Sequence, residues 1–251
     1  MAAGTSPLLA VFVDADNIPA KHANAIFREI SSFGNPGLRR VYGDWSSPVL
    51  RGWKDEARAL GLVAHQQTAN TSGKNATDIG LVIDAMDVLH SGRFDGFVLV
   101  SSDSDFTRLA ARIREQGLDV IGIGEKKAPA SFLAVCTRFI LIENIVAPTE
   151  PAPAQKPAPG HAPADKVAEP PATAKENPTK VIPLVRAAMR KIDPDGEWYM
   201  LGQLGQFIQK DHPDFDPRTY GSAKLSDLLR KTRAFEVKSG EANHLMVRDL
   251  A

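Results

Sequence analysis

The sequence predicts an α/β protein in two parts: a mostly parallel β-sheet with helices on both faces, followed by a small winged-helix domain. Three observations lead to this prediction. Short apolar runs alternate with helically spaced segments through residues 1–147, a Pro- and Ala-rich stretch fills residues 148–178, and residues 179–251 have the pattern of three helices and a hairpin. Regular alternation of strand and helix is typical of a parallel sheet covered by helices.

The composition is that of a globular protein without a chain-wide charge. The 251 residues include 30 Lys or Arg and 30 Asp or Glu, so the formal net charge is zero. This balance removes the simplest argument for nucleic-acid binding, an overall basic excess. The single cysteine, Cys136, excludes an intramolecular disulfide or a cysteine-built zinc site, and its apolar surroundings predict an inert buried thiol.

No targeting or membrane signal is evident. No apolar run approaches the roughly 18 residues that a membrane span needs. Residues 1–7 carry no positively charged side chain and lead directly into an apolar run, unlike a signal peptide. We therefore expect a cytoplasmic protein with no membrane partner.

The first domain reads as alternating strands and helices. The run at 8–13 is continuously apolar, as expected for a strand buried on both faces. The further strands are expected at 38–42, 62–65, 96–100 and 120–123, and the helices at 18–33, 49–60, from 77 onward, and 106–116. Segments 131–136 and 139–142 complete the domain.

The second part of the chain contains a linker and a small domain. Residues 148–178 contain nine Pro and eight Ala but no aromatic residue, so they predict a semi-rigid spacer that does not fix the geometry of its neighbours. Beyond it, helices are expected at 181–192, from 201 to before Pro213, and around 225–229. Two alternating runs near 235–237 and 244–247 then predict a hairpin, which completes a winged helix carrying a net charge of +2.

Acidic residues gather where the predicted strands end. Asp14-Ala15-Asp16-Asn17 follows the first strand, and Ser101-Ser102-Asp103-Ser104-Asp105 follows the strand at 96–100. Asp78 stands at the expected start of a helix, with Asp84 six residues further along. In open parallel sheets, functional groups gather outside the carboxyl ends of the strands, so we expect these carboxylates to share one edge.

Two interpretations of these acids remain open. Each Asp or Asn alone could cap a helix N-terminus, where it accepts orphan backbone N–H groups. Together they favour a site for Mg²⁺ or Mn²⁺, since both ions prefer oxygen ligands and a cluster of carboxylates needs a neutralising cation. No glycine-rich phosphate loop follows the first strand, which disfavours a nucleotide cofactor.

Several neighbouring residues are candidates for contact with a substrate. Asn17 can orient a carboxylate or hold a water, and Lys74 can meet a phosphate as a compact positive charge. Asn75 adjoins Lys74 just before the acidic helix start, and Ser102 lies within the second acidic segment. For Lys74, simple exposure to solvent is an equal alternative.

These motifs together resemble the NYN domain family. The segments that carry the resemblance are 11–19, 74–78 with Asp84, and 100–106, within a match over roughly residues 8–146. The resemblance implies a Rossmann-like fold of the PIN nuclease group and metal-dependent ribonuclease chemistry. It also implies that Asp14, Asp78, Asp103 and Asp105 are the catalytic metal-site carboxylates, with Asn17 beside them. Asp84 is carried over less securely because the fourth acid varies in this family.

The C-terminal part resembles the OST-HTH family, also called LOTUS, over about residues 180–249. The resemblance rests on segments 198–205, 215–221 and 225–229. It implies RNA binding or, in some members, docking of a protein partner. Basic and aromatic residues of the helices and wing are candidates for phosphate contact: Arg218, Tyr220, Lys224, Arg230, Lys231 and Lys238. Packing of Tyr220 in the core and a solvated basic face are the alternatives.

The favoured hypothesis is a Mg²⁺- or Mn²⁺-dependent endoribonuclease with an appended RNA-binding module. The main alternative is a non-catalytic RNA-binding or regulatory adaptor that keeps the acidic fold. A metal-dependent phosphatase acting on small nucleotides is a third possibility, and the added helical module argues against it. The sequence gives no indication of the oligomeric state or of the natural RNA.

Overall fold

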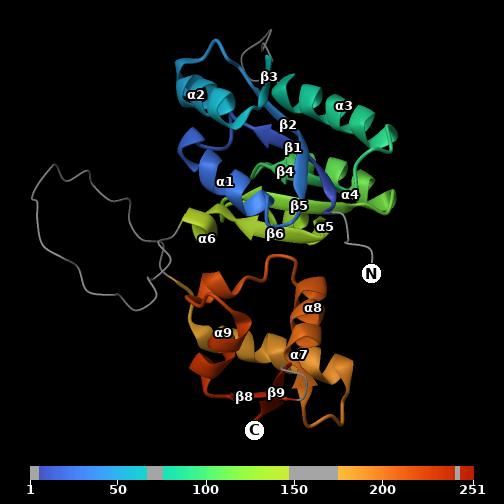
Figure 1. The fold of residues 1–251 in the computed structure, drawn as a ribbon, viewed down its shortest axis with the longest axis vertical. Helices are drawn as coiled ribbons and strands as arrows, with labels where there is room; N and C mark the ends of the chain where they lie inside the picture. The colour runs from blue at the N-terminus through green and yellow to red at the C-terminus, as the bar shows by residue number, and fades with distance from the viewer. Residues whose placement is uncertain (1–5, 67–75, 147–174, 241–243) are drawn as a thin grey trace, which may run out of the picture.

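A computed structural model describes residues 6–66, 76–146, 175–240 and 244–251, which form two domains (Figure 1). The N-terminal domain is built on a six-stranded sheet in which all pairs are parallel, in the order β3-β2-β1-β4-β5-β6. Its strands are β1 (Leu8–Asp14), β2 (Asn35–Gly43), β3 (Val63–Gln66), β4 (Gly96–Val100), β5 (Asp119–Gly124) and β6 (Arg138–Leu141). The predicted α/β class is confirmed.

Helices cover both faces of this sheet (Figure 1). One face packs against α1 (Ala23–Ile30), α2 (Arg51–Leu60) and α6 (Ile142–Val146). The other face packs against α3 (Ala76–His90), α4 (Thr107–Glu115) and α5 (Ala130–Val135). Short 3₁₀ turns precede α1, α2 and α4 at Ala20–His22, Pro48–Leu50 and Ser104–Phe106.

The continuous apolar run of the first strand has a clear structural reason. From Leu9 onward, every residue of β1 is buried, because β1 lies between β2 and β4 with helices on both sides. Alternate side chains enter the two cores, with Val11 and Val13 on one side and Phe12 on the other. Burial on both faces removes the polar alternation that a half-exposed strand would show.

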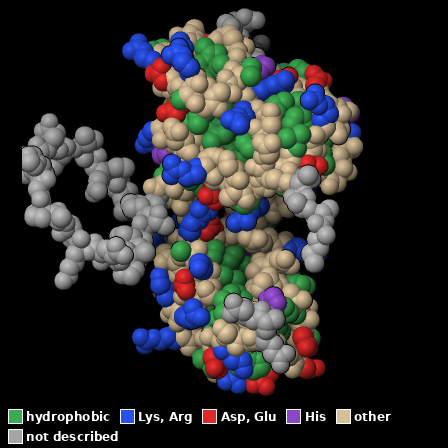
Figure 2. Space-filling model, in the orientation of Figure 1, with side chains coloured by type: hydrophobic (Ala, Val, Ile, Leu, Met, Phe, Trp, Pro, Cys, Tyr) green, Lys and Arg blue, Asp and Glu red, His purple; other side chains and the backbone are tan. Residues whose placement is uncertain are grey.

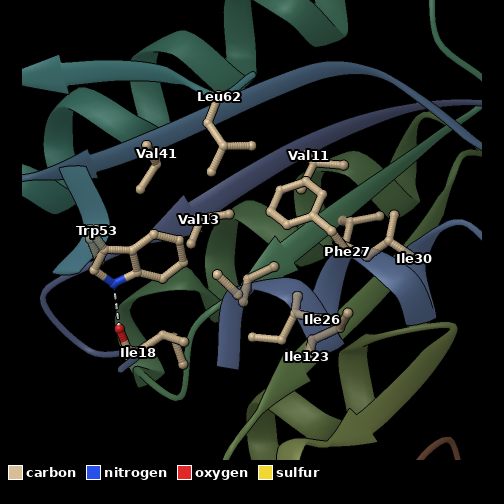
Figure 3. Close-up of a cluster of buried hydrophobic side chains, with 14 of the residues drawn as sticks. Val11, Val13, Ile18, Ile26, Phe27, Ile30, Val41, Trp53, Leu62 and Ile123 are labelled. Atoms are coloured by element: carbon tan, nitrogen blue, oxygen red, sulfur yellow. Dashed lines mark hydrogen bonds between the residues drawn. The ribbon is translucent and has the colours of Figure 1, made fainter. Parts of the chain in front are cut away.

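A polar bond inside the first core fixes the loop after β1. The Trp53 indole Nε1 donates to the backbone carbonyl of Ile18 at 2.7 Å, and both residues are almost completely buried (Figure 3). A buried carbonyl needs such a partner to offset its desolvation. Helix α2 therefore holds the segment that directly follows Asp14–Asn17.

A segment with turn-forming residues is the start of a strand. Asn35-Pro36-Gly37 resembles a loop, yet β2 begins at Asn35, three residues earlier than expected. The pairing with β1 shifts between Leu9 and Ala10, whose partners are Pro36 and Leu38, so Gly37 is the extra residue. This one-residue irregularity allows the strand to include Pro36 and Gly37.

The C-terminal domain has the expected helices and wing. Its helices are α7 (Ile182–Ile192), α8 (Leu201–Asp211) and α9 (Leu225–Thr232), with 3₁₀ turns at Pro178–Val181 and Pro217–Tyr220. The hairpin consists of β8 (Phe235–Ser239) and β9 (Leu245–Asp249). A further strand, β7 (Tyr199–Met200), pairs with β9 and makes the sheet three-stranded. Two residues are too few to show a strand period in the sequence.

Of the predicted linker, residues 148–174 lie outside the described part of the chain. Residues 175–178 already belong to the folded domain: Asn177 caps the first 3₁₀ turn, and Glu176 pairs with Lys126 of the N-terminal domain at 3.1 Å. The C-terminal domain lies beside β6 (Figure 1). Residues 175–178 thus belong to the folded domain, and the flexible linker between the two domains stays a prediction for residues 148–174.

Candidate metal centre

The acidic residues come from three elements that meet at the carboxyl edge of the sheet. Asp14 ends β1, while Asp103 and Asp105 follow β4, its direct neighbour in the sheet. Asp78 lies in the first turn of α3, which packs against β1. One carboxylate oxygen from each of Asp78, Asp103 and Asp105 lies within 4.8 Å of the others.

Asp14 is the most deeply placed of these carboxylates, with only 1% of its surface exposed. Its Oδ2 accepts from Ser101 Oγ and from Asn17 Nδ2, both at 2.7 Å, and its Oδ1 accepts from the Asn17 backbone N–H at 3.2 Å. Burial raises the pKa of Asp14, and these hydrogen bonds oppose that shift. Asn17 therefore orients a carboxylate, one of the two roles considered for it.

Ser101 connects two of the acidic residues, although the sequence analysis did not single it out. It is 1% exposed, and besides donating to Asp14 it accepts the backbone N–H of Asp103 at Oγ, at 3.1 Å. One hydroxyl thus fixes the ends of β1 and β4 relative to each other. Its place as the first polar residue after an apolar strand was the available signal.

The close approach of β5 helps to shape this edge. A Cβ at Gly124 would lie 2.5 Å from the backbone oxygen of Ser101 and 3.0 Å from Ser102 Oγ. Only glycine allows this spacing without a shift of the backbone. Ser102 itself is 6% exposed, and its Oγ accepts the backbone N–H of Glu125 at 2.8 Å. Ser102 thus supports the loop after β5, and its hydroxyl already has a protein partner.

The carboxyl group of Asp78 has a raised pKa, to which burial and neighbouring charges both contribute. Its pKa is raised to about 6, first by burial and then by the negative charges of Asp14, Asp103, Asp105 and Asp16. Such mutual repulsion is relieved when a divalent cation binds. Three carboxylate oxygens at this spacing are a donor set of the kind that Mg²⁺ and Mn²⁺ accept.

Helix capping and the acidic cluster coexist here. Asp103 Oδ1 accepts the backbone N–H of Asp105 at 3.0 Å and so caps the 3₁₀ turn that leads into α4. Asp14 likewise accepts the N–H of Asn17 in a local turn. Each of these carboxylates has a second oxygen or lone pair beyond its capping bond. Capping therefore positions them and does not exclude a cation.

Asp84 belongs to a different cluster. Its Oδ2 pairs with Arg40 Nη1 at 2.7 Å, accepts a short hydrogen bond from the Tyr42 hydroxyl, and lies 3.7 Å from His65 Nδ1. The group of three that could hold a cation does not include it. Among the described residues, Asp84 therefore ties α3 to β2.

The other candidates for substrate contact have varied positions. Lys74 and Asn75 lie outside the described residues. In the C-terminal domain, Lys224 is exposed and directly precedes α9. Tyr220 is partly buried against the core of its own domain, 6.1 Å from Phe215 between ring centroids. Tyr220 therefore packs against the core, which was the alternative to phosphate contact.

Arg218 is the candidate with the most contacts. Its guanidinium binds Asp216 of its own domain and Glu29 of α1 in the N-terminal domain. It lies between the two domains in the described structure. Lys231 and Lys238 also have partners, since Lys231 Nζ donates to the Gly221 carbonyl at 2.6 Å and Lys238 Nζ lies 3.5 Å from the centre of the Trp198 ring.

Comparison with known families agrees with this architecture. The family profile of the NYN domain matches residues 8–143, which span the whole parallel sheet and its acidic edge. The chain belongs to the NYN domain family. The family profile of the OST-HTH/LOTUS domain matches residues 173–247. The NYN domain is a PIN-like nuclease family, and OST-HTH/LOTUS domains bind RNA.

Two solved structures illustrate what this NYN protein is similar to. A protein of unknown function from Vibrio parahaemolyticus is 19% identical, with a TM-score of 0.48, and the match covers 57% of this chain and 96% of that one. An uncharacterised protein from Nitrosomonas europaea is 31% identical, with a TM-score of 0.26, and the match covers 39% of this chain and 93% of the other. Among curated proteins, none matches the sequence. None of the helices in the described residues is long and apolar enough to cross a membrane.

Proposed function

We propose that this NYN protein is a divalent-metal-dependent endoribonuclease whose OST-HTH domain holds RNA. The observation that supports the proposal best is the meeting of Asp78, Asp103 and Asp105 from two elements within 4.8 Å. Folding brings these like charges together at the edge where parallel sheets carry their functional groups. A bound divalent cation neutralises these charges.

In this proposal the carboxylates divide the work. Asp78, Asp103 and Asp105 hold Mg²⁺ or Mn²⁺, and Asp14 lies beneath them, held by Ser101 and Asn17. A bound divalent ion supplies charge stabilisation at a phosphodiester and lowers the pKa of a water. The rigid hydrogen bonds to Asp14 keep its negative charge next to that site, which favours cation binding and a positioned water.

RNA contacts in the proposal come from the basic residues that remain accessible. Lys224 before α9 and Arg230 in its last turn are both exposed. Arg230 Nη1 lies 3.4 Å from Asp227 Oδ1, and an exposed ion pair of this kind contributes little to stability. Both can meet phosphates in a sequence-independent way, consistent with a domain that carries only a small positive charge.

The direct test is cleavage of a labelled single-stranded RNA by the full chain with Mg²⁺, with Mn²⁺ and with EDTA. We expect cleavage that stops with EDTA and falls with Asp103→Asn by more than the roughly 10–100-fold that outer-shell changes cost. Asp119→Asn is the matched control, because Asp119 is exposed at the amino end of β5, opposite the acidic edge. Cleavage that survives EDTA or Asp103→Asn contradicts the proposal.

Two other outcomes point to the alternative functions. Salt-sensitive RNA binding without cleavage in either metal identifies a regulatory adaptor. Release of phosphate from mononucleotides with no cleavage of the RNA identifies a phosphatase. Size analysis of the products separates the latter from endonucleolytic cleavage, because an endonuclease yields internal fragments.

A further inference from the structure

The two domains meet through a branched ion pair centred on Arg218. The guanidinium donates to Glu29 through Nη2 at 2.7 Å and Nη1 at 3.2 Å, each to a different carboxylate oxygen. The exposed fractions of the Arg218 and Glu29 side chains are 29% and 18%. A two-pronged arginine–carboxylate contact of this kind is specific in geometry as well as favourable in charge.

Arg218 is held for this contact by its own domain. Asp216, which is 6% exposed, accepts from Arg218 Nε at 2.9 Å and from Nη2 at 2.7 Å, and it also accepts the Arg218 backbone N–H at 2.8 Å. The side chain therefore has little freedom to lose when it binds a second anion. Its outer edge, formed by Nη1 and Nη2, is the part that meets Glu29.

Other contacts across the boundary are also polar. Asn144 Nδ2 donates to Thr219 Oγ1 at 2.8 Å, and the backbone N–H of Phe139 in β6 donates to the Pro213 carbonyl at 2.9 Å. Figure 2 shows basic and acidic side chains gathered where the two domains meet. A cavity of about 360 Å³ remains beside them and has a mixed lining from both domains, in which Leu133, Leu141, Leu184 and Phe215 alternate with polar residues such as Lys126 and Asp214.

This combination describes an interface that can open. Polar contacts with incomplete apolar packing are typical of domains that move relative to each other. The charges balance across the boundary, since the two guanidinium groups of Arg138 and Arg218 lie near the two carboxylates of Asp216 and Glu29. The Arg138 guanidinium also stacks on Phe33, with 4.8 Å between its carbon and the ring centre. Separation exposes charged groups to water, which can solvate them.

We propose that the outer edge of Arg218 is a phosphodiester-binding site of the OST-HTH domain, and that Glu29 occupies this site when the domains are docked. A planar guanidinium binds a carboxylate and a phosphate with the same pair of parallel N–H groups. Both anions need the same two nitrogens, so RNA at Arg218 and docking on the NYN domain exclude each other. The proposal rests on RNA binding by the OST-HTH domain, as proposed above.

The consequence is a self-occluded form of the protein. RNA binding through Arg218 has to compete with Glu29, which is tethered in the same chain and therefore present at a high effective concentration. The apparent affinity for RNA is reduced by the fraction of molecules that are docked. Contact with a strongly charged RNA then releases the OST-HTH domain from β6 and from α1.

Two variants that break the same ion pair from opposite sides test this proposal. Glu29→Gln removes the competing carboxylate and keeps Arg218, whereas Arg218→Ala removes the binding group itself. Glu56→Gln and Arg190→Ala are the matched controls for charge: Glu56 is half-buried on α2 with a hydrogen bond from Asn24, and Arg190 is exposed on α7. All are made in the full chain, and circular dichroism checks folding.

Two measurements are made on each variant. Fluorescence anisotropy with a labelled 12-nucleotide single-stranded RNA in EDTA reports affinity without cleavage, and small-angle X-ray scattering reports separation of the domains. We expect both Glu29→Gln and Arg218→Ala to increase the radius of gyration. Only Glu29→Gln is expected to tighten RNA binding, by about tenfold relative to Glu56→Gln.

The proposal is overturned by any of three results. Equal tightening by Glu29→Gln and Arg218→Ala shows that docking covers a different RNA-binding surface. No tightening beyond the Glu56→Gln control, or no domain separation in either variant, removes the competition. No RNA binding by any variant overturns both this inference and RNA binding by the OST-HTH domain. Tightened binding without cleavage in metal supports the inference and contradicts only the nuclease activity.

Discussion

Lowering the pH from 7 to 5 is expected to weaken binding of Mn²⁺ to the acidic edge. The pKa of Asp78 is raised to about 6 because the carboxyl is partly buried and faces the charges of Asp14, Asp103 and Asp105. A carboxyl with this pKa is about nine-tenths ionised at pH 7 and about one-tenth ionised at pH 5. Since only the ionised form binds a metal, affinity for Mn²⁺ should fall about tenfold.

The same shift predicts how the metal-free protein responds to pH. The pKa of Asp78 lies above its ordinary value of 3.8, so the folded state holds this proton more tightly than the unfolded state does. The resulting stabilisation is complete below pH 3.8 and is lost as the pH rises through about 6. Added Mn²⁺ should have the opposite trend, with its stabilisation growing over the same range.

Isothermal titration with Mn²⁺ at pH 5, 6 and 7 measures the affinities directly. Asp78→Asn removes the titrating group, so its weaker binding should be nearly constant between pH 5 and 7. Asp119→Asn should keep the response of the unaltered chain. An affinity that does not change with pH, or a tenfold decrease that persists in Asp78→Asn, refutes the role of this carboxyl.

Three substitutions test the support of the site, and a fourth in the C-terminal domain provides a contrast. Ser101→Ala removes a donor to the buried carboxylate at the end of β1 and should lower the free energy of unfolding by about 1.5–3 kcal/mol, measured by urea denaturation, with weaker Mn²⁺ binding. Trp53→Phe leaves the buried Ile18 carbonyl without its donor, so a loss of about 1–3 kcal/mol is expected in the same assay; an unchanged midpoint contradicts the reasoning. Gly124→Ala forces apart the ends of β4 and β5 and should cost about 1–3 kcal/mol and weaken Mn²⁺ binding. Gly202→Ala, in a helix with open space around it, should instead stabilise by about 0.5–1 kcal/mol.

The position of the acids could be predicted because it follows from local pattern and topology together. An apolar run that is buried on both faces identifies a central strand, and parallel neighbours place their carboxyl ends at one edge. Asp14 ends β1, Asp103 and Asp105 lie shortly after β4, and the two strands are neighbours in the sheet. The sequence did not reveal Ser101 as the link between them, because a hydroxyl after a strand has many possible partners.

The separate place of Asp84 follows from helix geometry. Six residues along a helix correspond to about 9 Å of rise and to a rotation of about 600°, which is about 120° short of two full turns, so Asp78 and Asp84 point in different directions. Only the packing of α3 on β2 showed that Asp84 would meet Arg40 and Tyr42. A carboxylate that has an arginine partner no longer needs a cation.

The sequence by itself determined the α/β class, the winged-helix domain and the acidic edge, because periodic burial and strand-to-helix alternation are local properties of the chain. The tertiary structure alone decided which charges pair across long sequence separations. Glu29 and Arg218 are 189 residues apart, and no pattern in the sequence relates them. Their contact depends on where the second domain docks, which is set by shape and charge on two folded surfaces.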